Sequence, residues 1–208
     1  MRQSEVVPAE ATEKRDNRAA RIRALLAAGL VLGLGATITL AAWNDSEFVR
    51  GTFTAGTFNL VGSTDGSSFS NHATSGAAAS LDFTLNPTDL SPGDIVYAPF
   101  AVELDATTTS DALVAINNVA PTGSVSDLTY KLVQPAAFEC DAATTGTVLV
   151  AAATAVGTVP GSPSFALDKG TLGNPGDPVF LCFTVTAGVG LTQGQTGSAT
   201  WQFLATSQ

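Results

Sequence analysis

The chain has 208 residues, of which 45% are hydrophobic and 13% are charged, with a formal net charge of −9 at pH 7. This length and apolar content allow one domain with a sizeable core, preceded by a targeting segment. Residues 42–208 hold 14 acidic and 3 basic residues, a formal charge of −11, which excludes nucleic-acid binding through clustered Lys and Arg and disfavours anionic membrane surfaces.

An uncharged apolar run covers residues 24–42, directly after a stretch rich in basic residues. This order is typical of a secretory signal peptide, with small residues Thr39 and Ala41 at positions −3 and −1 before the cut. The sequence predicts a signal peptide over residues 1–41, cleavage between Ala41 and Ala42, and a secreted or cell-surface protein. Because the run approaches the roughly 20 residues that span a bilayer, an uncleaved membrane anchor is the alternative.

After the predicted cut, short strand-like segments alternate with Gly-, Pro- and Ser-rich turns. Residues 42–62 favour extended structure, and residues 62–80 read as a surface loop. Leu81, Phe83 and Leu85 alternate with polar residues, which predicts a half-buried strand. Pro99, within the next predicted strand, indicates an edge position or a bulge. The other predicted segments are a turn at 86–94 and strands at 95–104, 111–119, 128–133, 147–153, 179–185 and 200–205.

Eight or nine short strands, with no amphipathic helix after residue 42, predict an all-β fold. The expected architecture is a single β-sandwich or jelly-roll-like domain over residues 42–208. Its two cysteines, Cys140 and Cys182, are expected to form a disulfide bond in an exported chain. Two buried free thiols are the alternative. The absence of a CxxC pair argues against redox or zinc chemistry at these cysteines.

The sequence shows no recognisable catalytic constellation, so no catalytic residue, metal or cofactor is predicted. His72 is the single histidine, whereas zinc hydrolases use two or three, and no GxSxG elbow occurs. His72 is therefore expected to be an exposed loop residue. The acid pairs are expected to be surface charge, with a glycosidase pair or weak calcium binding as alternatives; these acids are Glu103/Asp105, Glu139/Asp141, Asp65, Asp89 and Asp94.

Several segments resemble the TasA/camelysin family of Gram-positive bacteria. Residues 41–45 read AAWND, residues 51–60 read GTFTAGTFNL, residues 89–94 read DLSPGD, and residues 199–206 read ATWQFLAT. The resemblance is strongest over residues 37–60. The high Ala and Thr content and the scarcity of Lys are similar to an actinobacterial relative.

The resemblance implies export by the general secretory route, cleavage by a SipW-type signal peptidase and contact with the membrane only during export. It also implies a subunit of extracellular biofilm-matrix fibres, whose partners are other copies of the chain or other matrix components. In that family, subunits join when the mature N-terminal segment adds as a strand to a neighbour. The match places this assembly segment at residues 42–60, with Trp43, Phe48, Phe53 and Phe58 filling the neighbour's groove.

Two alternative functions are kept. Camelysin members have been classed as metal-dependent endopeptidases, so a secreted metalloendopeptidase is one alternative, in which His72 would be the imidazole ligand. A cell-surface adhesin or other binding module is the second. It would use exposed aromatic residues on one face of the sandwich.

Overall fold

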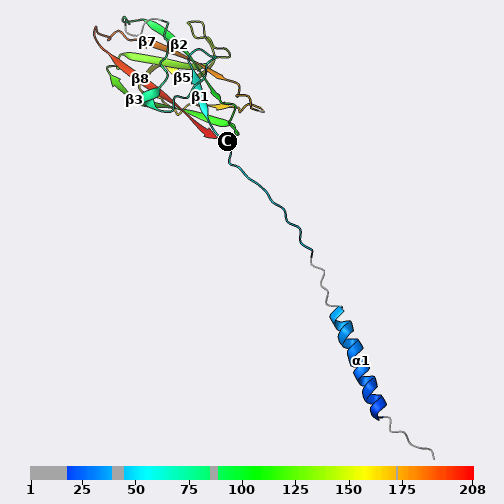
Figure 1. Ribbon diagram of the computed structural model, residues 1–208. Helices are drawn as coiled ribbons and strands as arrows, with labels where there is room; N and C mark the ends of the chain where they lie inside the picture. The colour runs from blue at the N-terminus through cyan, green and yellow to red at the C-terminus, as the bar shows by residue number, and fades with distance from the viewer. Residues whose placement is uncertain (1–17, 39–44, 85–88, 172) are drawn as a thin grey trace, which may run out of the picture. The chain divides into compact units, whose positions relative to one another are not determined.

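The computed structural model describes residues 18–38, 45–84, 89–171 and 173–208 (Figure 1). The chain divides into two units, Met1–Phe53 and Thr54–Gln208. The first contains helix α1 (Arg18–Ile38), which is rich in the good helix formers Ala and Leu, and then residues 45–53 without helix or strand. Within the described part of the chain, no helix is long and apolar enough to cross a membrane.

Helix α1 overlaps the apolar run in which the signal peptide is predicted. The predicted cleavage residues Thr39, Ala41 and Ala42 lie outside the described residues, and so does Trp43. Cleavage therefore stays a prediction.

The second unit is a sandwich of two antiparallel sheets, which confirms the expected all-β fold. The five-stranded sheet has the order β1-β2-β7-β4-β5, and the three-stranded sheet has the order β6-β3-β8. The strands are β1 (Leu60–Ser63), β2 (Ile95–Leu104), β3 (Ala112–Gly123), β4 (Leu128–Gln134), β5 (Thr147–Ala155), β6 (Ser164–Leu167), β7 (Val179–Ala187) and β8 (Gly197–Ser207).

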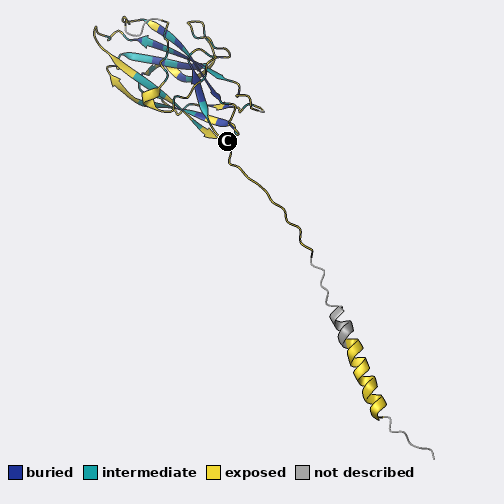
Figure 2. Ribbon diagram, viewed as in Figure 1, coloured by how far each residue is buried: buried dark blue, intermediate teal, exposed yellow. Residues whose placement is uncertain are grey.

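The core lies between the two sheets, because every second residue of a strand points to the same face. Figure 2 shows the buried residues gathered along the strands of the sandwich. Aromatic side chains of β8 join the two layers: the ring of Phe203 stacks on Phe100 of β2 at 5.7 Å, and Trp201 lies 4.8 Å from Phe183 of β7, measured between ring centroids. The inner face of β8 is therefore fixed by the core.

Most predicted strands are confirmed, and the structure extends several of them. The strand predicted at residues 95–104 has the bounds of β2, and those at 111–119, 128–133, 147–153, 179–185 and 200–205 fall within or largely overlap β3, β4, β5, β7 and β8. Within the described part of residues 42–62, which were expected to be extended, only the end forms a regular strand, as β1, and β6 was not predicted. Each has only four residues, too few for alternation to stand out from chance.

Pro99 occupies an edge position even though β2 is an interior strand. β1 pairs only with residues 101–104, so the first half of β2 has an open side. Tyr97 directs its N–H and C=O to that side, where both bond to Thr84. Pro99, two residues further on, has the same orientation, so its missing N–H removes no ladder hydrogen bond.

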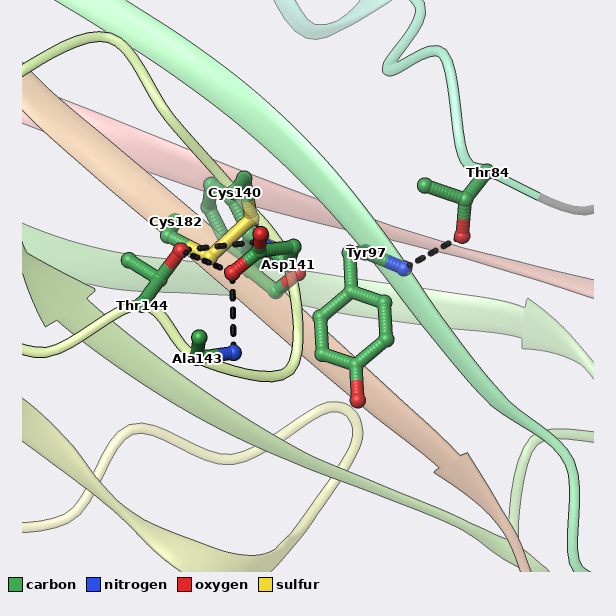
Figure 3. The surroundings of a disulfide bond; sticks show 8 residues. Thr84, Tyr97, Cys140, Asp141, Ala143, Thr144 and Cys182 are labelled. Carbon is green, nitrogen blue, oxygen red and sulfur yellow. Dashed lines mark hydrogen bonds between the residues drawn. A yellow bond between two sulfur atoms is a disulfide. The ribbon is translucent and has the colours of Figure 1, made fainter.

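The predicted disulfide bond joins Cys140 and Cys182, with a Cα–Cα distance of 5.1 Å (Figure 3). Cys182 lies in β7 and faces away from the core, since its neighbours Leu181 and Phe183 are core residues on either side of it. Cys140 lies in the loop between β4 and β5. The bond therefore ties this loop to the outer face of the five-stranded sheet.

We expect the double variant Cys140→Ala/Cys182→Ala to lose about 4 kcal/mol of unfolding free energy, because the bridge closes a long loop in the unfolded chain. Urea denaturation of both proteins measures this difference. Unfolding midpoints that agree under oxidising conditions would contradict the expectation.

Candidate functional site: an open groove along β8

The sandwich has four sheet edges, and three of them are short or irregular. β1 and β6 have four residues each. β5 carries Ala153 at a positive φ of 60° and is out of regular register with β4, as at a β-bulge. β8 has 11 residues, and its last eight pair with β3 without interruption. Because an exposed regular edge is a template for another strand, β8 is the edge most open to strand addition.

The free edge of β8 presents backbone groups without partners. The N–H of Gln208, directly after β8, donates to Asp111 O at 2.9 Å. By alternation, the even-numbered residues of β8 direct their backbone N–H and C=O groups to β3. Trp201, Phe203 and Ala205 therefore direct their N–H and C=O groups to the free edge. Within the described ranges, β8 is paired with β3 alone. A neighbouring strand would satisfy these groups.

A groove of about 850 Å³ runs along this edge. It is lined by Trp201 and Phe203 of β8, by residues 71–75, 78–81 and Phe83, and by core side chains of β2 and β7, among them Phe100. The sheets differ by two strands in width, so this side of the larger sheet lacks a covering strand. The groove is thus an unfilled part of the sandwich core.

Residues 80–84, here called the strap, border the groove but form no strand, so that prediction is wrong for the described part of residues 80–85. Leu81 and Phe83 are half-buried against the core, as their alternation indicates. Thr84 alone bonds to a strand: its N–H donates to Tyr97 O at 2.9 Å, and its Oγ1 accepts from Tyr97 N at 3.2 Å (Figure 3). The strap has strand character but no partner strand, because β8 lies across the groove.

The chain enters the domain at residues 57–59, here called the anchor, which are held by hydrogen bonds to residues of the loop after β2. The backbone N–H of Asn59 donates to Thr108 Oγ1 at 3.0 Å, and its carbonyl accepts from the N–H of Asp105 at 3.1 Å. Asn59 Nδ2 also donates to the Asp105 carboxylate, which lowers the pKa of Asp105 together with donors from Thr107 and Thr108. The N–H of Thr109 donates to Thr57 O at 3.0 Å. Residues 57–59 are therefore held by their own domain.

The anchor divides the predicted assembly segment of residues 42–60. Phe58 is 39% exposed and lines the groove of its own domain. Phe48 and Phe53 precede the anchor and are 93% and 94% exposed. The residues available for donation therefore end before Thr57, since residues 57–59 are held by these hydrogen bonds and Leu60 begins β1.

His72 lies on the groove wall and is half-buried, not exposed as expected. Its Nε2 is 3.3 Å from Ser70 Oγ, and its Nδ1 is buried without a hydrogen-bond partner. A search of the described residues finds no cluster of three or more His, Cys, Asp or Glu that could hold a metal ion. The predicted imidazole ligand of the metalloendopeptidase alternative therefore has no ligand set around it in this part of the chain.

Glu103 is 8% exposed, so the expectation of a solvated Glu103/Asp105 pair is wrong. Glu103 lies opposite Val61 of β1 in the five-stranded sheet. Burial raises the pKa of Glu103, and the nearby Asp105 charge raises it further. Glu139 and Asp141 are exposed, as expected of surface charge.

Two of the acidic residues considered as calcium ligands, Asp65 and Asp94, accept hydrogen bonds within their own turns. Asp65 accepts hydrogen bonds from the N–H groups of Ser68 and Ser67, which hold the pKa of Asp65 well below its usual range. Asp94 accepts from the N–H of Ser91 at 2.7 Å. Both carboxylates thus have a structural role in their own loops.

No protein-family model matches the chain, and no curated protein does either. Function is therefore inferred from the groove, from the exposed segment before it and from the resemblance seen in the sequence.

We expect Glu103→Gln to stabilise the protein at neutral pH. A raised pKa means that the folded state favours protonated Glu103, so stability falls as pH rises from the ordinary pKa of glutamate through the raised value. The neutral glutamine does not carry this penalty, so the difference from the parent protein should grow across that range. Urea unfolding at several pH values measures it.

Glu139→Gln is the matched control, because Glu139 is exposed. A Glu103→Gln effect that is the same at acidic and neutral pH would contradict the expected linkage.

Proposed function

We propose that the protein is a secreted structural subunit of extracellular biofilm-matrix fibres. A segment of one copy, drawn from residues 42–56, adds as a strand to the groove along β8 of the next copy. The observation that carries this proposal is the combination of a long unpaired edge at β8 with an apolar groove beside it. Each copy then has one donor and one acceptor, which generates an open chain of subunits.

The size of the groove supports a peptide strand as its occupant. A strand within a sandwich fills roughly 160 Å³ per residue, from a rise of about 3.3 Å, a strand spacing of about 4.8 Å and a sheet spacing of about 10 Å. A groove of about 850 Å³ therefore accommodates on the order of five residues. A short segment is sufficient to complete the core.

The composition of the segment supports it as the donor. Residues 45–53 read DSEFVRGTF and contain three exposed apolar side chains, Phe48, Val49 and Phe53. Burying a large apolar side chain contributes about 1.5–3 kcal/mol. Val49 and Phe53 lie on the same face of an extended segment. Together in the groove they would stabilise a subunit contact that also gains backbone hydrogen bonds along β8.

The compartment rests on the predicted signal peptide and on the resemblance to secreted fibre subunits. The Cys140–Cys182 bond is compatible with it, since disulfide bonds persist in oxidising environments. The acidic composition of residues 42–208 favours solubility of single subunits before assembly.

Residues 48 and 53 lie on opposite faces of an extended segment, so one of them faces the groove in either register. We expect Phe48→Asp/Phe53→Asp to reduce filament formation at least tenfold, because a carboxylate cannot enter an apolar groove without a large desolvation cost. Negative-stain electron microscopy and sedimentation of the secreted protein measure assembly. The control is Val189→Asp, which changes an equally exposed apolar residue in the loop before β8.

Filaments that form equally well from the double variant would exclude residues 48 and 53 as donors. A parent protein that stays monomeric at all salt and pH conditions tested would contradict the proposed function itself.

We expect mass spectrometry of the secreted protein to show a chain that begins at Ala42. This follows from the small residues Thr39 and Ala41 before the cut. A chain retaining residues 1–41 in the cytoplasmic membrane would contradict export with cleavage.

A further inference from the structure

The groove has two long sides, and only one of them is β8. Residues 80, 81 and 83 of the strap also line the groove, and the strap is held at its end by Thr84, which bonds to Tyr97 of β2. Its inward side chains, Leu81 and Phe83, already pack on the core. The groove is present with the strap in this position, so an incoming strand does not have to displace it.

Displacing the strap would also be unfavourable. Leu81 and Phe83 would both leave the core, and each large apolar side chain that returns to water costs up to about 1.5–3 kcal/mol. An incoming strand would have to replace these contacts before it gained any of its own. Insertion beside the strap avoids this loss.

Among the residues described, the strap has unpaired backbone N–H groups on its side away from β2. The N–H of Thr84 points to β2, and successive residues of an extended chain direct their N–H groups to opposite sides. Phe83 and Leu81 therefore direct theirs away from β2. In the described structure these two N–H groups have no hydrogen-bond partner.

We infer that the donated strand lies between β8 and the strap, and that the strap pairs with it as a further strand of the smaller sheet. This inference rests on the proposed function and specifies its acceptor site. The partner is an extended segment of a second copy, bound along both edges. Because both edges contribute hydrogen bonds, the donated strand is bound as an interior strand and not as an added edge.

Disulfide cross-linking between two singly substituted copies of the secreted protein tests this arrangement. The native cysteines are bonded to each other and no free thiol is present among the described residues. One copy carries an acceptor cysteine at an exposed outward position, Gln202→Cys in β8 or Asp82→Cys in the strap. The other copy has a distinguishing tag and a donor cysteine at one of residues 46–52 in turn.

Outward side chains on neighbouring strands have Cβ atoms about 4.5–5.5 Å apart, within disulfide reach. We therefore expect mild oxidation to join the tagged donor copy to the acceptor copy at both acceptor positions. The donor residues that react with the two positions should be the same residue or residues two apart. Yields should be at least tenfold above those of Val148→Cys, an exposed control on the remote edge strand β5. Non-reducing gel electrophoresis measures them.

Cross-links at Gln202→Cys alone would overturn the role of the strap and leave the proposed function intact. Cross-links at Asp82→Cys alone would overturn the inference, because β8 would not be the second edge. Cross-links at neither position would overturn both the inference and the proposed function. If Asp82→Cys changes the circular-dichroism spectrum, Ser80→Cys replaces it, since Ser80 is exposed on the same side of the strap.

Discussion

The backbone groups at the edge of β8 must find hydrogen-bond partners, and the chain supplies none for them within the described part of the sandwich. The constraint arises because a three-stranded sheet packs against a five-stranded sheet. Trp201 and Phe203 fix the position of β8 through their contacts with Phe183 and Phe100. The edge therefore cannot move to meet β1 or the strap. An unfilled strip of core remains beside it.

Two devices hold the remaining parts of the fold in place. The anchor at Asn59 and Asp105 fixes where the N-terminal segment leaves the domain. The Cys140–Cys182 bond ties the β4–β5 loop to the outer face of the larger sheet, where Phe138 packs against Phe180. Neither device covers the groove. The domain is therefore stabilised away from β8 while the groove stays accessible.

Several residues show which features a local sequence pattern predicts and which it does not. Leu81 and Phe83 face the core as their alternation predicts, yet no strand forms there, because pairing depends on a partner that the pattern does not specify. Glu103 was expected on a solvated face, but it is buried where β2 pairs with β1. Phe58 shares the apolar character of Phe48 and Phe53, but hydrogen bonds to the neighbouring residues 57 and 59 keep it in its own domain.

The amino-acid sequence by itself determined the all-β class, the bounds of β2 and the pairing of two cysteines. These depend on period-two alternation and on residue counts, which are local properties. Only the tertiary structure decided which edge stays open, where the groove lies and which residues before β1 remain free. These depend on contacts between segments far apart in the chain, such as Asn59 with Asp105 and Trp201 with Phe183. A one-dimensional pattern carries no information on such pairings until the sheets pack.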